Sequence, residues 1–282
     1  MSPSGIEPTE RLSDFAAIAR TVSWGAADIL RSYYRGDVKE ISKDDGPVTA
    51  ADLAANRYIV EKLTASFTGE GFGYLSEETY VGTTPLPEPW VWIIDPLDGT
   101  RDFIDKTGEY AIHLALTFEG RPMVTVVTIP EAEKIYFATK GGGTFVETRD
   151  GTIKPIKVSE RSTPSDLLLV ASRTHRDARF QELLNRMPFK DRNYMGSVGG
   201  KISTILEQGS DVYISLSGKS AAKDWDFAAP ELILTEAGGG FSYFDGRPVL
   251  YNQGDVKKWG GIMASNGHCH AELCEIATTT LA

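Results

Sequence analysis

Apolar residues recur at helical spacing between about residue 10 and residue 35 of the chain. The repeating positions include Leu12, Phe15, Ile18, Val22, Ala26 and Ile29. An amphipathic helix presents an apolar residue every three or four positions, so this spacing predicts a first helix that ends before Gly36. A second helical pattern covers residues 48–63, where Thr49 is the natural N-cap.

Alternation of apolar and polar residues replaces this pattern after residue 110. The segments 110–118 and 123–129 flank the turn EGRP, and the segments 134–139 and 144–148 flank three glycines. Each pair has the pattern of an antiparallel hairpin. From residue 167 apolar runs such as LLLVAS and DVYISL alternate with helical patterns such as RDARFQELLNRM. That alternation indicates an α/β arrangement.

The change of pattern predicts two domains. The chain has 282 residues, and a domain averages about 150 residues. We expect the boundary in the polar stretch VSERSTPSD. Residues 1–160 would form an N-terminal α+β domain with an antiparallel sheet, and residues 161–282 a C-terminal α/β domain with the substrate-binding loops.

Composition excludes several classes of protein. The chain has 39 acidic and 29 basic residues, a net charge of −10, so it would repel a nucleic-acid polymer. It has no run of about 18 apolar residues to cross a membrane, and its first residues, MSPSGIEPTERL, lack the regions of a secretory signal. We therefore expect a cytoplasmic protein that binds neither membranes nor nucleic-acid polymers.

A short strand predicted at 91–94 runs directly into the acidic loop DPLDGT. Its residues are β-branched and aromatic, and Gly99 allows a sharp turn after it. Asp95 and Asp98 can then point into one pocket, where the carbonyl of Leu97 adds a further oxygen. Hard cations such as Mg²⁺ prefer such oxygen ligands. The alternative is an Asp-rich turn that only caps a helix, because Asp, Pro and Gly are the ordinary residues of turns.

Further acidic residues lie at predicted chain reversals. Asp52 falls in capping-box position after Thr49, so it either caps the second helix or turns toward the acidic loop. Glu77 and Glu78 follow a short apolar run, where adjacent acids are commonly just solvated. Both interpretations stay open for each of these positions.

A helical pattern over residues 225–237 adds one more acidic residue to the candidates. Asp226 is expected at its start, either as the N-cap or as a site residue. Pro230 is tolerable there if it lies near the first turn, and the glycines of 238–240 would end the helix.

Histidine and cysteine give weaker signals. His113 lies inside an apolar strand pattern, and we expect a buried core histidine there rather than a catalytic one. His268, Cys269, His270 and Cys274 lie close together near the C-terminus, but their spacing is that of neither a disulfide framework nor a zinc finger. A zinc site is not favoured, and the role of these four residues stays open.

Four separated motifs carry a family resemblance. They are VTAAD at 48–52, SEE at 76–78, DPLDGT at 95–100 and WDFAAPELILTEAGG at 225–239. In this order they resemble the inositol monophosphatase superfamily of Mg²⁺-dependent, lithium-sensitive phosphatases. Within it the chain is most similar to the 3'(2'),5'-bisphosphate nucleotidases, through DGTRDF, SRTH at 172–175 and the K-D-W-D-x-x-A-P-E pattern from 223.

The resemblance implies a layered α/β/α/β/α sandwich and a metal-dependent hydrolysis. The implied ligands of two or three Mg²⁺ ions are Glu77, Asp95, the carbonyl of Leu97, Asp98 and Asp226. The implied catalytic residues are Asp52, Thr100 and Glu77. Carboxylates crowded in this way repel one another, so cations that neutralise them suit the same set.

The implied substrate is adenosine 3',5'-bisphosphate, which would lose its 3'-phosphate to give AMP. The expected substrate-binding residues are Gly99, Thr100, Arg173, His175, Ser197, Lys201 and Asp226. Arg173, His175 and Lys201 are the candidates for its second phosphate, because an acidic protein must supply positive charge locally. The Gly-rich GSVGGK before the next helix departs in spacing from some relatives, so the backbone group that meets the substrate there stays open.

Two other functions remain open at this point. An inositol or fructose phosphatase would share every metal ligand. A non-catalytic, metal-dependent nucleotide-binding module would not need Asp52 or Thr100. The sequence does not decide between a monomer and a homodimer.

Overall fold

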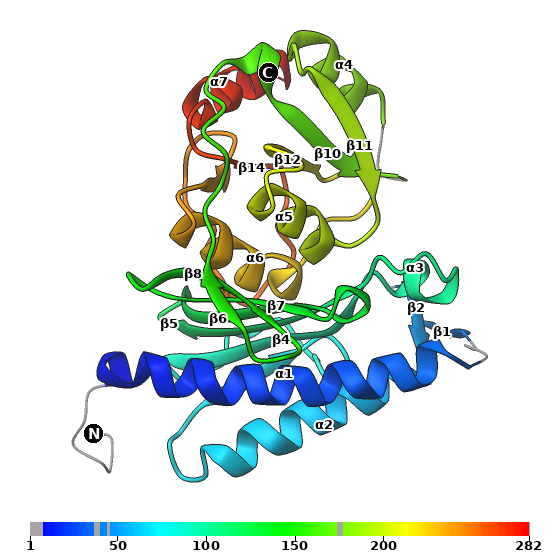
Figure 1. The fold of residues 1–282 in the computed structure, drawn as a ribbon, viewed down its shortest axis with the longest axis vertical. Helices are drawn as coiled ribbons and strands as arrows, with labels where there is room; N and C mark the ends of the chain where they lie inside the picture. The colour runs from blue at the N-terminus through cyan, green and yellow to red at the C-terminus, as the bar shows by residue number, and fades with distance from the viewer. Residues whose placement is uncertain (1–7, 37–39, 44–45, 174–176, 282) are drawn as a thin grey trace.

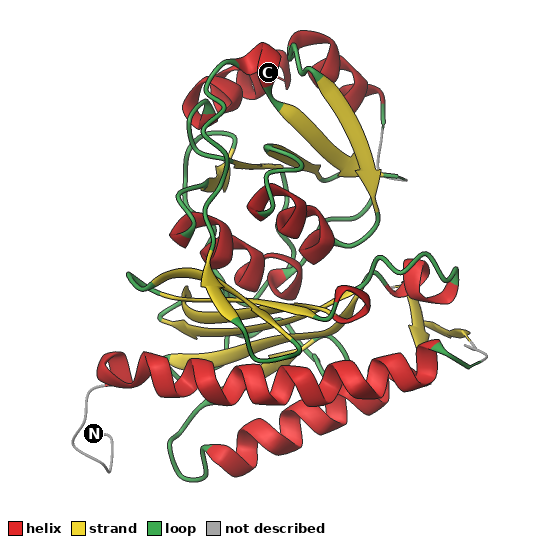
Figure 2. Cartoon of the chain, viewed as in Figure 1, coloured by secondary structure: helices red, strands yellow, loops and turns green. Residues whose placement is uncertain are grey.

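Layers of helix and sheet alternate through the molecule in the order α/β/α/β/α (Figure 1, Figure 2). The computed structural model describes residues 8–36, 40–43, 46–173 and 177–281. Its helices are α1 Leu12–Tyr34, α2 Ala50–Ser66, α3 Thr100–Ile104, α4 Ala178–Arg186, α5 Val198–Leu206, α6 Asp224–Glu236 and α7 His270–Leu281. Short 3-10 helices span Pro8–Arg11, Pro130–Ala132 and Pro164–Asp166. The layer order confirms the expected sandwich.

The first sheet has seven strands in the order β3-β4-β5-β6-β7-β8-β9. They are β3 Gly73–Ser76, β4 Trp90–Asp98, β5 Ala111–Phe118, β6 Arg121–Ile129, β7 Lys134–Thr139, β8 Gly143–Thr148 and β9 Ile153–Pro155. Both predicted hairpins, β5–β6 and β7–β8, are confirmed. The expectation of an antiparallel sheet is wrong at one edge, where β3 runs parallel to β4. A long connection joins these two strands, and a parallel pair requires one.

The second sheet has five strands in the order β11-β10-β12-β14-β13. They are β10 Leu168–Ser172, β11 Asp191–Met195, β12 Val212–Leu216, β13 Gly240–Tyr243 and β14 Gly261–Ser265. β10 pairs parallel with β11 and β12, whereas β14 pairs antiparallel with β12 and β13. The apolar runs LLLVAS and DVYISL form β10 and β12, as predicted. The pattern did not predict β11, a largely exposed edge strand of polar residues.

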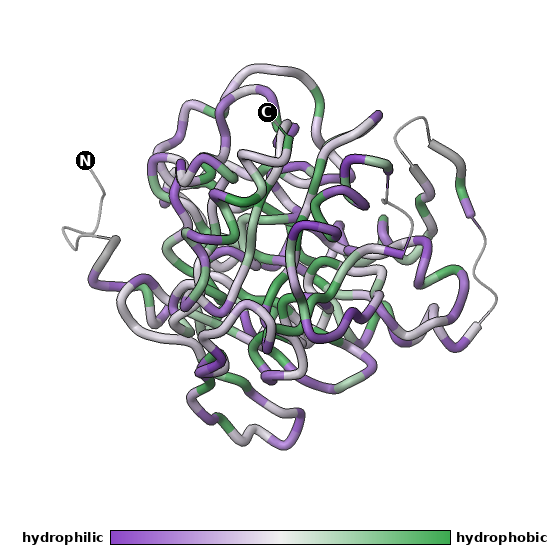
Figure 3. The backbone as a smooth tube through the Cα atoms, turned by 90° about the horizontal axis from the view of Figure 1, so that it is seen from above, coloured by the Kyte–Doolittle hydropathy of each residue, from purple (hydrophilic) through white to green (hydrophobic). Residues whose placement is uncertain are grey.

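Helices cover both faces of each sheet (Figure 1). α1 and α2 pack on the outer face of the first sheet. Phe15 of α1 is fully buried there, and its ring centroid lies 5.4 Å from that of Phe67. Burying a side chain of this size contributes about 1.5–3 kcal/mol. α4 and α7 cover the far face of the second sheet. In the view from above, many hydrophobic segments lie in the middle of the molecule (Figure 3).

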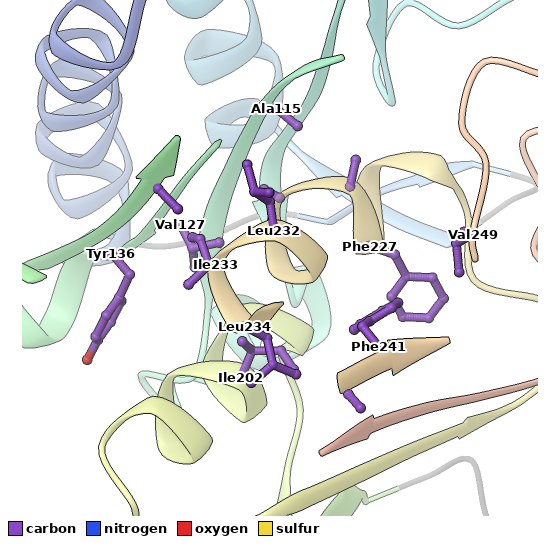
Figure 4. Packing of buried hydrophobic residues seen from close by; sticks show 14 of the residues in the cluster. Ala115, Val127, Tyr136, Ile202, Phe227, Leu232, Ile233, Leu234, Phe241 and Val249 are labelled. Atoms are coloured by element: carbon purple, nitrogen blue, oxygen red, sulfur yellow. The ribbon is translucent and has the colours of Figure 1, made fainter. Parts of the chain in front are cut away.

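The central core joins the two halves of the chain. α5 and α6 lie between the sheets, and Leu232 and Ile233 of α6 point toward the first sheet near Ala115 (Figure 4). On the other side Phe227 packs on Phe241 of the second sheet, with ring centroids 5.6 Å apart. The division at residue 160 stays a prediction, and packing across it is continuous.

A short antiparallel hairpin, β1 Glu40–Lys43 with β2 Gly46–Thr49, leads into α2. The pattern of apolar and polar residues did not predict this hairpin. Strands of four residues leave too short a pattern for alternation to be recognised.

None of the helices in the described part of the chain is long and apolar enough to span a membrane.

Candidate active site

Three carboxylates meet where β4 ends. Asp95 and Asp98 lie on β4, and Asp226 lies in the first turn of α6. Each offers one oxygen, and these oxygens lie within 4.8 Å of one another. Residues three apart on a regular strand face opposite ways, but the register between β4 and β5 shifts between Asp95 and Asp98. This bulge brings both onto one pocket, and we call the three residues the acid cluster.

Gly99 makes the turn that follows β4. Its φ is +91°, and a Cβ at this position would lie 2.9 Å from the carbonyl oxygen of Glu109. Any other residue would be both strained and crowded here. The turn starts α3 at Thr100 and places its hydroxyl 3.2 Å from the Leu97 carbonyl oxygen.

Asp95 and Asp98 are buried and Asp226 is half-buried, and the acid cluster holds more negative charge than it can stabilise alone. Burial raises the pKa of Asp95 well above its ordinary value, and the charges of Glu77, Asp98 and Asp226 raise it further. Burial also raises the pKa of Asp226 to about 6, although the N–H of Lys223 opposes this shift. A bound cation would relieve the repulsion between these carboxylates. Carboxylate oxygens are hard ligands, so the acid cluster fits a divalent metal ion.

Glu77 lies beside the acid cluster rather than within it. It follows β3, and its N–H donates to the carbonyl of Ile94 on β4 at 3.2 Å. Burial and then the charge of Asp226 raise the pKa of Glu77 to about 8, while Lys223 acts in the opposite direction. The charge of Glu77 in turn raises the pKa of Asp95, so the two carboxyl groups lie close enough to interact.

Asp98 has a different environment from the other acids. Its Oδ2 accepts hydrogen bonds from the Ser197 hydroxyl and, at 2.8 Å, from the Gly199 N–H. His113 Nε2 lies 3.3 Å from the same oxygen. Burial acts to raise the pKa of Asp98, but His113 and these hydrogen bonds outweigh it and lower the pKa to about 2. Asp98 therefore stays ionised without help from a metal.

The Gly-rich segment before α5 supplies these donors. Ser197 is the N-cap of α5 and accepts from the Gly200 N–H at 2.9 Å. A Cβ on Gly199 would lie 2.5 Å from His113 Nε2, so only glycine lets the helix start approach Asp98 this closely. The Gly199 amide donates to a carboxylate of the protein, and the backbone group that would meet a substrate there stays open.

Asp52 combines both roles that the sequence left open. Its Oδ2 accepts from the N–H of Thr49 at 2.8 Å and from the Thr49 hydroxyl at 2.6 Å, in a capping box at the start of α2. Its Oδ1 accepts from the Thr100 hydroxyl at 3.1 Å. Burial raises the pKa of Asp52 above its ordinary value, and the bonds from Thr49 oppose that shift.

Asp226 is placed by the same device, and this corrects two expectations. The N-cap of α6 is Lys223, and its N–H donates to Asp226 Oδ2 at 2.6 Å, so Asp226 stands at the third helical position. Pro230 lies inside the helix, beyond its first turn. The pattern around Trp225 concealed this earlier start, because Asp224 is itself buried in the helix.

His113 is a site neighbour that the sequence analysis did not identify. It is buried in β5, as expected, and pairs in register with Asp95. Its Nδ1 lies 3.1 Å from the Trp225 carbonyl oxygen, and its Nε2 faces Asp98. The available signal was a polar residue in an apolar strand after the acidic loop, but its register could not be inferred from the pattern.

Lys201 does not lie where the sequence analysis expected it. The residue is 1% exposed, and its ammonium donates to the carbonyls of Gly196, at 2.5 Å, and Ser197, at 3.2 Å. Burial lowers the pKa of Lys201 to about 8. The first turn of α5 directs the side chain inward, over the ring of Tyr213. Lys201 therefore fixes the loop that carries Ser197 and does not face solvent.

Arg173, just after β10, joins the second sheet to the region of the acidic loop. Its guanidinium pairs with Asp102 of α3, at 2.7 Å, and with Glu109. Glu109 also accepts from the N–H of Gly196 at 2.9 Å. Arg173 is half-exposed and already shared between two carboxylates. His175 lies outside the described residues.

A cleft of about 450 Å³ opens beside Glu77. Charged and aromatic residues that line it include Glu77, Glu78, Lys223, Trp225, Asp255 and Lys257. This cleft, called the Glu77 cleft below, borders the acid cluster at Lys223, whose N–H donates to Asp226.

The C-terminal cysteines and histidines form no comparable site in the described structure. His270 is held by two serines, with Nε2 2.9 Å from the Ser242 hydroxyl and Nδ1 2.9 Å from the Ser265 hydroxyl. Both ring nitrogens are thus engaged. The acid cluster is the one group of potential metal ligands found among the described residues.

Comparison with protein families matches residues 11–281 to the inositol monophosphatase family. The 3'(2'),5'-bisphosphate nucleotidase CysQ of Aggregatibacter actinomycetemcomitans is 30% identical over 248 residues, which are 87% of this chain and 88% of that protein. CysQ of Escherichia coli K12 is 32% identical, over 80% of this chain and 89% of that one. The 3'-phosphoadenosine 5'-phosphate phosphatase of Mycobacterium bovis is 30% identical over 73% of each chain.

Solved structures agree on the fold. The IMPase of Thermotoga maritima superposes with a TM-score of 0.78 at 23% identity, over 95% of this chain and 97% of that one. The inositol monophosphatase of Anabaena gives a TM-score of 0.76 at 24% identity, over 95% and 97% of the two chains.

Proposed function

The chain belongs to the inositol monophosphatase family of phosphatases, and we propose that it removes the 3'-phosphate of adenosine 3',5'-bisphosphate to give AMP and phosphate. The observation that carries the proposed chemistry is the acid cluster beside a hydrogen-bonded Asp52 and Thr100. The choice of nucleotide rests on relatives that are named as bisphosphate nucleotidases or phosphatases and are 30% identical to this chain. A place in sulfur assimilation follows from that choice of substrate.

We further propose that the site works with Mg²⁺, two or three ions in all. The residues that would hold them are Glu77, Asp95, the carbonyl of Leu97, Asp98 and Asp226. When bound, Mg²⁺ supplies positive charge to the phosphoryl oxygens and acidifies water.

The remaining chemistry falls to side chains of this chain. The Thr100 hydroxyl and the Asp52 carboxylate would orient the attacking water and receive its proton. The oxygen of that water forms a bond to phosphorus as the bond from phosphorus to the 3'-oxygen breaks, and the departing oxygen takes up a proton from solvent. Amides of Gly99 and Thr100 would hold phosphoryl oxygens during this displacement. Glu77 would contribute as a metal ligand beside the acid cluster.

The second phosphate of the substrate requires a positively charged side chain near Ser197. Arg173 and His175 remain the proposed contacts, whereas Lys201 would act only by fixing the loop. Arg173 would have to exchange Asp102 or Glu109 for phosphate, so this contact should be weaker than that of an unpaired arginine.

Release of inorganic phosphate from three substrates tests the proposal. We expect kcat/KM to be highest for adenosine 3',5'-bisphosphate, lower for inositol 1-phosphate and fructose 1,6-bisphosphate, and abolished by excess EDTA. A preference for the inositol or fructose compound would make the chain a sugar phosphatase with the same metal site. Binding of nucleotide without any phosphate release would make it a binding module.

A further inference from the structure

Lys223 stands at the junction of the acid cluster and the Glu77 cleft. It immediately precedes α6 and lines the cleft together with Glu77 and Glu78. Its main chain forms an isolated antiparallel bridge with that of Lys257. The bond from its N–H to Asp226 holds it from the other side. The backbone of Lys223 is therefore fixed, whatever its side chain does.

The ammonium of Lys223 is also confined. Its Nζ lies 5.1 Å from the centroid of the Trp225 ring. Trp225 is 2% exposed and packs edge-on against Tyr80, with ring centroids 5.7 Å apart, so it is a rigid support. A cation over an indole face gains about 0.5–2 kcal/mol. The positive charge is thus kept on the wall of the Glu77 cleft.

The acids around this charge are numerous. Glu77, Glu78 and Asp255 line the same cleft, and Asp226 is bonded to the Lys223 backbone. Lys257 also lines the cleft, but its ammonium lies near another ring, 5.9 Å from the centroid of Trp259.

We propose that Lys223 is a built-in counter-cation that neutralises the Glu77 side of the acid cluster and weakens the binding of divalent metal there. This inference rests on the proposed metal site. A fixed positive charge that attracts these acids also repels an incoming cation. Lys223 is in this sense a positioning residue with two parts: its N–H orients Asp226, and its ammonium sets how tightly the Glu77 side holds metal.

The two parts can be separated by mutation. Lys223→Met keeps the backbone N–H and most of the side-chain volume but removes the charge, whereas Lys223→Arg keeps the charge. Lys257→Met removes a charge from the same cleft at a different place, so it controls for net charge alone. Far-ultraviolet circular dichroism and Tm establish that each variant is folded, and Lys223→Gln replaces Lys223→Met if that variant does not fold.

Mn²⁺ titration, with free Mn²⁺ followed by electron paramagnetic resonance, provides a readout independent of turnover. Lys223→Met should bind its weakest Mn²⁺ about 10-fold more tightly than wild type, or bind one additional ion. Lys223→Arg should match wild type, and Lys257→Met should differ from it by less than about twofold.

Several results would overturn the proposal. Equal or weaker Mn²⁺ binding by Lys223→Met would show that its charge does not act on the metal. An equal gain in Lys257→Met would assign the effect to net charge. Loss of inorganic phosphate binding in Lys223→Met, with Mn²⁺ binding unchanged, would make Lys223 a phosphate ligand instead. If wild type bound no Mn²⁺ at all, the metal site of the proposed function would fail, and the role of Lys223 with it.

Discussion

The two sides of the acid cluster are built from the same kind of residue and behave in opposite ways. On one side Asp98 faces a hydroxyl, an amide and an imidazole, and its pKa falls to about 2. On the other side Glu77 faces burial and other acids, and its pKa rises to about 8. Charge state is therefore set by the donors that the fold provides, because the two carboxyl groups differ little in isolation.

This difference assigns the two sides different tasks. The Asp98 side is charged before any metal arrives, so it can attract a cation. The Glu77 side retains protons near neutral pH, so metal must displace them on binding. Substitutions and changes of pH that remove or increase this difference should have effects of decreasing size, from the loss of the Asp98 charge to a change in stability.

Removing the charge of the preformed side should have the largest effect. Asp98→Asn should lower kcat by about 1,000-fold or more, because the ligand that is already ionised is lost and the remaining acids must give up their protons before they bind metal. Phosphate release under saturating Mg²⁺ measures this, and circular dichroism checks the fold. Asp226→Asn should lower kcat to a similar extent. It should stay folded, because the asparagine oxygen can still accept from the Lys223 N–H. Activity like that of wild type in either folded variant would contradict the metal assignment.

Thr100→Ala leaves every proposed metal ligand in place and should cost less. It removes the hydroxyl that donates to Asp52, so kcat should fall about 10- to 1,000-fold while metal affinity changes little. Thr100→Ser is the matched control and should retain most of the activity. A large loss of metal affinity in Thr100→Ala would mean that the hydroxyl acts on the ligands rather than on water.

Lys201→Met tests how the Asp98 side is supported. The ammonium fixes the loop that carries Ser197, so its loss should lower kcat about 3- to 30-fold on adenosine 3',5'-bisphosphate and inositol 1-phosphate alike. A direct contact between Lys201 and the second phosphate, as expected from the sequence, would instead raise KM for the bisphosphate only. Parallel measurement of both substrates distinguishes these outcomes, and a selective KM effect would restore the direct phosphate contact.

The smallest expected effect is on stability. The pKa of Glu77 is raised from 4.5 to about 8 in the folded, metal-free protein, so its contribution to stability is complete below pH 4.5 and is lost as pH rises through about 8. The lowered pKa of Asp98 contributes stability at every pH above its ordinary value and adds no change between pH 6 and 9. Tm without metal should therefore fall by about 2–4 °C over this interval. Mg²⁺ should reduce that fall, and a Tm independent of pH without metal would contradict the assignment.

Much of the fold could be predicted because its elements have strong periodicity. Enough residues repeat the pattern for a helix or strand to be recognised in α1, in the hairpins of the first sheet and in the apolar runs of β10 and β12. The short β1–β2 hairpin and the polar edge strand β11 lack such a pattern. The acids of the site were recognisable because carboxylates at element ends stand out against apolar neighbours.

The partners of those acids could not be predicted in the same way. His113 reaches Asp98 through a strand register, and Lys201 turns inward because of where α5 begins. Neither fact is encoded in local composition. Tertiary placement decides whether a buried base binds substrate or holds the backbone.

The starts of α2 and α6 have a consequence for how this protein can change over time. Asp52 and Asp226 each give one oxygen to the backbone N–H that opens their helix, at 2.8 Å and 2.6 Å. Losing such a cap costs about 0.5–2 kcal/mol, a cost paid whether or not the enzyme is needed. A population of variants selected only for staying folded would therefore tend to retain a side-chain hydrogen-bond acceptor at both positions. Mutational drift toward residues without such an acceptor is opposed at these two positions by folding itself.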